Sequence, residues 1–593
     1  MMTRRHSIAS LAVCGWALLA LRALPAQTPA PCPTAALQAP AGSPQSVLPR
    51  TFAGPPTSAA ISACDLMTRL YRFADDSMGG RKIGTPDHER ATAMIAAEAK
   101  RLGLQPAGDN GTYFQALPLV SRALDTSSTI VAGRTTLRAG TDFLASTTAA
   151  RLTDFAGWTL VYGGSLLDTT ITLFSVPPSG TLVYFRPIAP GVDGSAIQKT
   201  AKGKAWVAWY NAIRHRATGN TPQLPAAAVR TALNPTALIL PADQGATLSL
   251  TLTTPAAQAL FGGSLDGLAA GTPAKSFTLT LRYVDTPRLD RNVVAVLPGS
   301  DPARRAQYVA LGAHVDHLGI FRSAVDHDSV RATHLGARSG AEGAASRRQV
   351  TDDDEYDRIK VLTDSLHTLR PVRRDSIYNG ADDGGSGTVA LLEIAETLAP
   401  KTNRPKRSVL FVWHTGTETA PTLSGSSWFL EHPTVPRDSI VAQLNVDMIG
   451  HGEATDEVGI TADEDPRFGH PDFVEVIGSR RRSTELSTLI TRANTGATPL
   501  RLDYAADAPG HPEGLFCRND QASYARVGIP VAFFTTGYHV DFRELTDEPQ
   551  YLRYGHMARI VQLVAATTQS LANLDHRPSL DLPAPDPKAA CKP

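Results

Sequence analysis

The sequence lacks an excess of charge of either sign, because 57 Lys and Arg residues are balanced by 56 Asp and Glu residues among 593. Proteins that bind nucleic acid or an anionic membrane usually carry a basic excess. Beyond its N-terminal segment the chain also lacks an apolar run long enough to cross a bilayer. We therefore expect no nucleic-acid partner, and no membrane attachment once the N-terminal segment has been removed.

Cysteine is scarce, with five residues in the whole chain and no pair spaced as CxxC. This spacing excludes a zinc knuckle. Four of the five lie outside the N-terminal segment, and an exported protein could pair them as disulfides. Disulfides and free buried thiols are both compatible with the sequence for Cys32, Cys64, Cys517 and Cys591.

The N-terminus has the pattern of a secretory signal. Arg4 and Arg5 precede a mostly apolar stretch from Ile8 to Leu24, and small residues surround Ala26. This order of basic, apolar and small residues predicts a signal peptide over residues 1–26. A short membrane anchor is the alternative, but Arg22 interrupts the apolar stretch. We expect export, to the periplasm or to the medium.

The length of the chain exceeds that of one ordinary domain. Composition divides it into a Pro- and Ala-rich linker (residues 27–60), an α/β domain in two parts (61–127 and 286–577), a β-rich insert (128–285), a polar surface insertion with little apolar periodicity (321–374) and a Pro-rich tail (578–593).

Five short apolar runs in the α/β domain predict buried strands, and helix-like patterns alternate with them. This alternation indicates a largely parallel sheet. The runs are Asn292–Leu297, Tyr308–Gly312, Ser408–Trp413, Gln443–Met448 and Ile529–Thr535, and the helices are expected at Ile61–Phe73, Glu89–Leu102 and Thr388–Leu398. In the insert, we predict strands at Trp158–Tyr162, Thr181–Phe185, Ala205–Trp209 and Ser276–Leu281.

Two adjacent carboxylates, Asp382 and Asp383, lie in a glycine-rich turn just before the predicted helix at Thr388–Leu398. Ser386 is the expected N-cap of that helix. Taken alone, an Asp-Asp-Gly turn is ordinary, since these residues dominate turns. The turn becomes a candidate metal site only when it is considered together with the other candidate ligands.

Candidate metal ligands follow several predicted strands. Ligand sites of α/β sheets lie at the carboxyl ends of strands, and His, Asp and Glu together suit zinc. Asp316 lies two residues after His314, where it could orient the imidazole. The residues at strand ends are His314, Asp316, Glu418 and Asp447.

The chain resembles metallopeptidase family twenty-eight, the co-catalytic di-zinc aminopeptidases, a family that also contains glutamate carboxypeptidases. Motifs in the family's order carry the resemblance: Gly80–Thr85, Leu102–Gly108, Thr112–Gln115, Gly312–Ile320, Asn379–Gly387, Asn445–Met448 and Gly528–Val531. The resemblance implies a three-layer α/β sandwich around a mostly parallel twisted sheet, peptide substrates and two zinc ions. It also implies a protease-associated domain in the position of residues 128–285.

The resemblance assigns roles to the candidate residues. His314 and Asp447 would bind one zinc, Asp382 would bridge both ions, Glu418 would bind the second, and Asp316 would orient His314. Paired metals of this kind activate water and polarise the scissile carbonyl. His314, Asp382 and Asp447 are therefore expected to form an intact half of the metal site.

Two residues depart from the family pattern. Thr417 occupies the position of the general base, a glutamate in the family, and a threonine hydroxyl cannot accept a proton from water at neutral pH. Arg543 occupies the position of the last histidine ligand, and arginine does not bind metal. His539 lies nearby but aligns with a position that is not a ligand.

Three interpretations remain open. The protein is a di-zinc aminopeptidase in which His539 replaces the missing ligand, a catalytically inactive relative that binds or scaffolds, or a hydrolase with a single zinc. For the second and third, we expect the Arg543 guanidinium to replace the lost metal by pairing with Glu418, Asp382 or both. The oligomeric state and the side-chain preference are not determined by the sequence.

Overall fold

The computed structural model describes residues 48–581 and Cys591, with gaps at 147–154, 179, 189–190, 235–237, 240–247, 337–352, 370, 419–423, 453–455, 464 and 496–498. The predicted signal peptide, residues 27–47 of the predicted linker and most of the predicted tail lie outside the described residues. Residues 48–60 form no helix or strand, but they contact the rest of the chain, since the Tyr71 hydroxyl donates to the carbonyl of Pro49 at 2.6 Å. None of the described helices is long and apolar enough to cross a bilayer.

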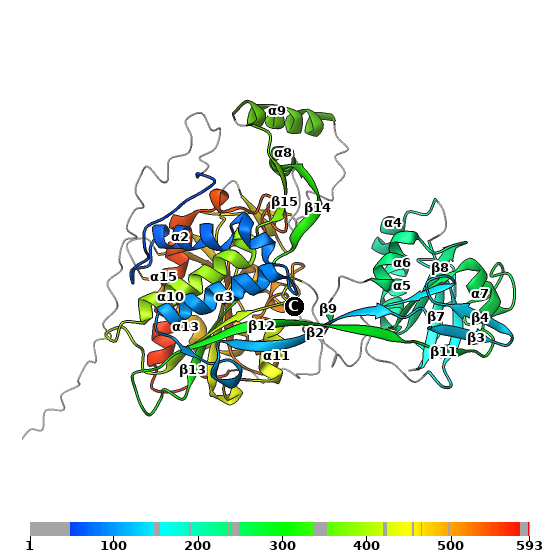
Figure 1. Cartoon of the computed structure of the whole chain (residues 1–593), viewed down its shortest axis with the longest axis horizontal. Helices are drawn as coiled ribbons and strands as arrows, with labels where there is room; N and C mark the ends of the chain where they lie inside the picture. Colours follow the sequence, from blue (N-terminus) through cyan, green and yellow to red (C-terminus); the bar gives the residue numbers. More distant parts are fainter. Residues whose placement is uncertain are drawn as a thin grey trace, which may run out of the picture.

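The body of the protein is built on a mixed sheet, which has ten strands among the described residues (Figure 1). Its four central strands, β16, β13, β17 and β22, are parallel, whereas β12 pairs antiparallel with β16 and with β2. All five apolar runs predicted as strands of this sheet are confirmed. The strands are β1 (Gln105–Pro106), β2 (Phe114–Leu124), β9 (Leu238–Ile239), β12 (Tyr283–Leu297), β13 (Tyr308–His314), β16 (Ser408–His414), β17 (Ile440–Val446), β20 (Phe473–Ile477), β21 (Arg501–Asp503) and β22 (Val531–Thr535).

Helices cover both faces of this sheet, which gives the predicted three layers. Phe411 and Trp413 of β16 pack into one core, while Leu410 and Val412 pack into the core of the opposite face. The first core is shared with α2 (Ala63–Phe73), α3 (Pro86–Arg101), α10 (Gly387–Leu398), α13 (Thr484–Ala493) and α15 (Tyr554–Asn573), and the second with α11 (Gly425–Glu431) and α14 (Gln521–Arg526). The three predicted helices correspond to α2, α3 and α10.

The long strands β2 and β12 run out of the body into a second lobe (Figure 1). This lobe holds a five-stranded sheet and a three-stranded sheet among the described residues, and helices pack on it. Its elements are β3 (Thr129–Ala132), β4 (Thr135–Arg138), β5 (Phe143–Ala145), β6 (Thr159–Ser165), β7 (Thr181–Arg186), α4 (Gly194–Lys199), α5 (Ala201–Ala212), β8 (Arg216–Thr221), α6 (Ala226–Leu233), β10 (Ser249–Thr253), α7 (Thr254–Phe261) and β11 (Thr278–Thr280). The predicted boundaries of this lobe, at residues 128 and 285, stay a prediction.

One strand predicted in this lobe is wrong, because Ala205–Trp209 lies within helix α5. Trp206 and Trp209 are both buried, and their spacing of three residues puts them on one helix face. Thr200 caps the helix by accepting a hydrogen bond from Gly203 N at 2.9 Å. The lobe is therefore mixed α/β and not mostly β.

The segment predicted as a polar surface insertion contains regular structure. Strands β14 (Gly319–Asp326) and β15 (Arg374–Tyr378) pair antiparallel, and helices α8 (His327–Gly336) and α9 (Asp353–Leu369) project from them at the top of Figure 1. Residues 337–352 of the insertion lie outside the described residues. The insertion is thus an arm with its own strands and helices.

The scattered cysteines are paired where the structure describes them. Cys517 and Cys591 form a disulfide across 74 residues of sequence, and Cys64 is also disulfide-bonded. Of the two alternatives that the sequence left open, disulfide formation holds for these three cysteines.

Candidate metal centre

The Asp382-Asp383 turn connects β15 to α10 and is fixed by a carboxylate far along the chain. Asp547 accepts hydrogen bonds from the backbone amides of Asp382, at 2.8 Å, and of Asp383, at 3.0 Å. Gly384 follows at φ +77°, and a Cβ at this position would lie 2.8 Å from Cε1 of His314. Only glycine therefore lets the turn approach the end of β13 this closely.

A buried arginine ties the same turn to β13. The Arg81 guanidinium donates to the carbonyls of Val315, at 2.9 Å, and of Gly380, at 2.8 Å. Its side chain is completely buried. The exit of β13, which carries His314, and the start of the turn are therefore held by one side chain.

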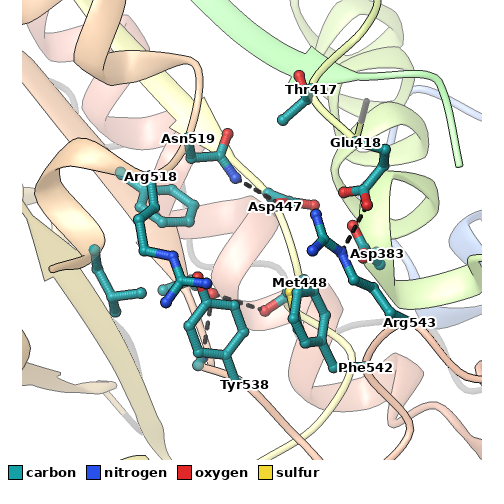
Figure 2. A pocket seen from close by; sticks show the side chains of 14 residues that line it. Asp383, Thr417, Glu418, Asp447, Met448, Arg518, Asn519, Tyr538, Phe542 and Arg543 are labelled. Carbon is teal, nitrogen blue, oxygen red and sulfur yellow. Dashed lines mark hydrogen bonds and ion pairs between the residues drawn. The ribbon is translucent and has the colours of Figure 1, made fainter. Parts of the chain in front are cut away.

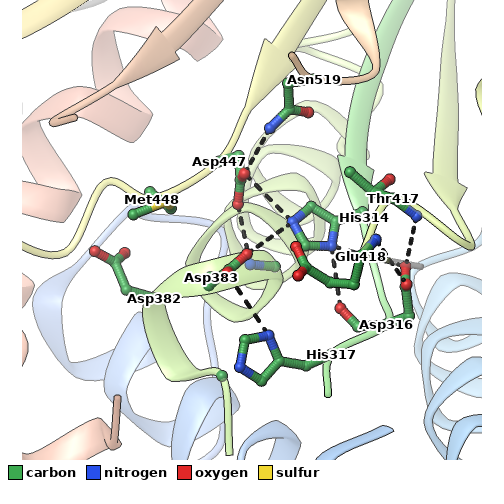
Figure 3. Close-up of polar contacts among 12 residues, drawn as sticks. His314, Asp316, His317, Asp382, Asp383, Thr417, Glu418, Asp447, Met448 and Asn519 are labelled. Atoms are coloured by element: carbon green, nitrogen blue, oxygen red, sulfur yellow. Dashed lines mark hydrogen bonds and ion pairs between the residues drawn. The ribbon is translucent and has the colours of Figure 1, made fainter. Parts of the chain in front are cut away.

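Asp383 of the turn meets two side chains from strand ends, and we call the three residues the His314 site: His314, Asp383 and Asp447 (Figure 3). His314 Nε2 lies 3.1 Å from Asp383 Oδ1 and 3.3 Å from Asp447 Oδ2. Despite these distances, Nε2 makes no hydrogen bond to any residue that the structure describes. Two ligand atoms about 2.0–2.1 Å from a tetrahedral zinc lie roughly 3.3 Å apart. The three residues therefore fit a zinc ion toward which all of them point.

The assignment of Asp382 to this half-site is wrong, because Asp383 takes its place. Asp382 points away from His314 (Figure 3), since its Oδ1 accepts the Gly450 amide at 2.7 Å and its Oδ2 lies 3.1 Å from His539 Nε2. Adjacent side chains of this tight turn face different directions. His314 and Asp447 lie in the predicted positions.

Asn519, which the sequence analysis missed, supports Asp447. Its Nδ2 donates to Asp447 Oδ2 at 2.7 Å, and the backbone amide of Gly384 donates to Asp447 Oδ1 at 3.0 Å. Asn519 comes from the segment before α14, which no motif singles out. Its side chain holds the carboxylate from the side opposite the turn.

Asp316 acts mainly on the loop that carries Glu418. Its carboxylate accepts the amides of Gly416, at 2.9 Å, of Thr417, at 3.3 Å, and of Glu418, at 3.2 Å. His314 Nδ1 faces the backbone carbonyl of Asp316 at 3.1 Å, while the carboxylate is 3.8 Å away. Asp316 thus orients His314 through its main chain and the loop through its side chain.

The pairing expected for Arg543 is present. Arg543 Nε donates to Glu418 Oε2 at 2.7 Å, and the Glu418 side chain is 6% exposed while that of Arg543 is 39% exposed (Figure 2). Arg543 has a left-handed backbone with φ 59°, which is strained for a residue with a side chain. Thr417 turns its hydroxyl to Asp520 Oδ2 at 3.1 Å.

Charges in the centre are strongly coupled. Burial, reinforced by the neighbouring Asp383, raises the pKa of Glu418 to about 8, and Arg543 opposes this rise. Burial alone would lower the pKa of His314, but Asp447 and the other nearby carboxylates raise it well above its usual value. The nearby carboxylates thus favour the protonated form of His314, and a zinc ion would compete with that proton for the ring nitrogen.

These residues line a small pocket of about 60 Å³ (Figure 2). Its wall includes Asp383, Glu418, Asp447, Arg518, Phe542 and Arg543, and Arg543 lies beside Glu418 (Figure 2). A volume of this size holds a few water molecules. A larger ligand would therefore have to displace side chains such as Arg543.

His539 belongs to a different cluster from Glu418. Its ligand atoms group with those of Asp382 and His451, whereas Glu418 groups with His314 and Asp383. His539 and Glu418 therefore fall in different clusters, and the interpretation in which His539 completes the second metal site stays a prediction. The sequence had no signal for His451.

Comparisons with known proteins give one family and several solved structures. Residues 356–568 match the model of Peptidase family M28. The chain is similar at 14% identity to BSAP, a zinc aminopeptidase from Bacillus subtilis, over 86% of this chain and 95% of that chain, with a TM-score of 0.41. It is similar at 12% identity to an aminopeptidase from Aneurinibacillus sp. strain AM-1, over 86% of this chain and 93% of that chain, with a TM-score of 0.41. It is similar at 13% identity to a peptidase M28 precursor from Shewanella amazonensis, over 88% of this chain and 98% of that chain, with a TM-score of 0.38.

Proposed function

We propose that this chain, of which residues 356–568 match the model of Peptidase family M28, is an exported, zinc-dependent exopeptidase of the aminopeptidase type whose hydrolysis is weakened. Peptides are its substrates in this proposal. The observation that carries the weakening is the Arg543–Glu418 ion pair at 2.7 Å inside the pocket. Export is supported by the signal-like residues 1–26 and by the Cys517–Cys591 disulfide, since disulfides persist in oxidising compartments.

His314, Asp383 and Asp447 would hold the catalytic zinc. A zinc ion with three protein ligands and an open position polarises a peptide carbonyl and activates water. Asn519 and the Gly384 amide keep the Asp447 carboxylate in place, and Asp547 and Arg81 keep the turn that carries Asp383.

Proton transfer is the step that this chain performs poorly. Thr417 cannot serve as base, so Glu418 is the pocket carboxylate left for that role, with an oxygen within 4.8 Å of the ligand atoms of His314 and Asp383. A cation beside a carboxylate favours its ionised form and makes it a weaker base. Arg543 therefore lowers the capacity of Glu418 to accept a proton.

A second candidate function is peptide binding without hydrolysis. The same ion pair favours it, because Arg543 fills the pocket and leaves only about 60 Å³. In that case the zinc would serve to bind the amino end of a peptide, and no turnover would be measured.

Kinetics on aminoacyl-p-nitroanilides distinguish these functions. Wild-type protein should hydrolyse them slowly in a zinc-dependent manner, and His314→Ala should abolish the activity. Thr417→Glu combined with Arg543→His should raise kcat by at least about tenfold, because a positioned general base contributes about 10²–10⁴-fold. Arg492→His, on the exposed side of α13, is the matched control. Zinc-bound wild-type and double-variant proteins that bind peptide but never hydrolyse it would refute the peptidase and leave the binding protein.

A further inference from the structure

Three buried residues on the other side of the Asp382-Asp383 turn have no role in the proposed hydrolysis. They are Asp382 from the turn, His451 from the segment after β17, and His539 from the segment after β22. Their exposed fractions are 0%, 6% and 3%. One potential ligand atom from each lies within 4.8 Å of the other two.

The orientation of these groups is not that of a hydrogen-bonded network. Asp382 Oδ2 and His539 Nε2 are 3.1 Å apart, yet neither atom has a hydrogen-bond partner among the described residues. The two imidazole rings stack, with centroids 3.8 Å apart and an angle of 20° between their planes. His451 Nε2 and His539 Nδ1 likewise have no hydrogen-bond partner in the described part of the chain.

Leaving several buried polar atoms unpaired is costly, at about 1–3 kcal/mol for each group. The other oxygen of Asp382 is already satisfied, because Oδ1 accepts the Gly450 amide at 2.7 Å. The free Oδ2 and the histidine nitrogens therefore require a common partner. Two imidazole nitrogens and one carboxylate oxygen form a ligand set that suits zinc, with water in the fourth position.

We propose that Asp382, His451 and His539, which we call the His451 site, bind a zinc ion separate from the His314 site. This ion would have a structural role, since its three ligands come from the turn and from the segments that follow two central strands. It would hold the turn from the side opposite to Asp383. The proposal does not depend on peptidase activity.

The competing arrangement is a protonated His539 paired with Asp382. It would satisfy Asp382 Oδ2 and His539 Nε2, but it would leave His451 Nε2 and His539 Nδ1 without a partner in the described structure. Another buried group, formed by His327, Asp375 and Glu548, differs because a cationic side chain already lies within it. There the Arg373 guanidinium already binds Glu548 at 2.7 Å and supplies the cation.

The test is a zinc count by mass spectrometry on full-length protein, loaded with zinc and freed of excess metal. We expect two ions per chain in the wild type and one in the His451→Ala/His539→Ala variant. The His314→Ala/Asp447→Ala variant should keep one ion, bound at the His451 site. His88→Ala is the matched control, because His88 is a buried histidine whose Nδ1 lies 2.7 Å from the single carboxylate of Asp290. It should keep both ions.

The outcomes separate this proposal from the proposed function. A single ion that is lost in His451→Ala/His539→Ala but retained in His314→Ala/Asp447→Ala supports the His451 site and contradicts the proposed zinc at the His314 site. A single ion that is retained in His451→Ala/His539→Ala but lost in His314→Ala/Asp447→Ala, or no ion at all, overturns the His451 site. If a variant does not fold, anomalous scattering at the zinc edge from wild-type crystals decides instead. A peak between Asp382, His451 and His539 supports the proposal, and its absence from zinc-soaked crystals overturns it.

Discussion

Replacing Asn519 with alanine should weaken zinc binding at the His314 site without unfolding the protein. Asn519 Nδ2 donates to Asp447 Oδ2 at 2.7 Å, whereas its Oδ1 accepts from the Asp520 amide at 2.7 Å and from Asn445 at 2.9 Å. These contacts fix the orientation of the amide. The variant removes the side chain that directs the Asp447 carboxylate toward His314.

The size of the effect can be worked out from this geometry. A hydrogen bond to a charged group contributes about 1.5–3 kcal/mol. Loss of a residue that orients a metal ligand costs about 10–100-fold in metal affinity, equivalent to about 1.4–2.7 kcal/mol. The two estimates agree. Asp447 keeps its second bond, from the Gly384 amide at 3.0 Å, and so stays partly oriented in the variant.

The assay is competition for zinc with a chromophoric chelator. It is done in the His451→Ala/His539→Ala background, so that binding at the His314 site alone is measured. Asn494→Ala is the matched control, since Asn494 makes a similar pair of bonds, to the carbonyl and the amide of Leu500 at 2.6 and 2.9 Å, away from the site. A Kd that changes by less than about twofold in Asn519→Ala, with circular dichroism unchanged, would refute the role given to this residue.

Further predictions concern the body and the arm. Arg69→Met removes a buried cation that pairs with three carboxylates, and it should lower the free energy of unfolding by about 3–5 kcal/mol in denaturant titrations. Burial raises the pKa of Glu393, one of the three, from 4.5 to about 8, so the folded state holds a proton that the unfolded state releases. Wild-type stability should therefore fall between about pH 4.5 and 8, and a flat profile would contradict this. Limited proteolysis should cut first within residues 321–374, and early cuts within residues 292–312 would argue against this domain plan.

The central sheet could be predicted from the sequence because parallel strands buried on both faces leave continuous apolar runs. β13 and β16 were found in this way. The same signal failed at Ala205–Trp209, because a run of five apolar residues has too few positions to separate a strand from a helix. In the structure Trp206 and Trp209 are both buried on one face of helix α5, and this burial favours the helix over a strand.

The metal centre was predictable only in part. His314, Asp447 and Glu418 follow strand ends, and the sheet brings them together as expected. The choice between Asp382 and Asp383 was not predictable, because it depends on backbone angles that Asp547 fixes across more than 160 residues of sequence. Asn519 and His451 were missed for the same reason, since each gains its role only through distant partners.

Charge balance predicts that Arg543 and a second zinc ion beside Glu418 would exclude each other. With Glu418 ionised, Asp383, Glu418 and Asp447 would bring three negative charges to the pocket, and one doubly charged zinc at the His314 site together with the Arg543 guanidinium would neutralise them. A second zinc ion within a few ångströms would then add uncompensated positive charge in a partly buried site, where repulsion reaches several kcal/mol. Substitution of Arg543 by histidine removes that charge and supplies a ligand, so the family's second metal position depends on this residue more than on Thr417.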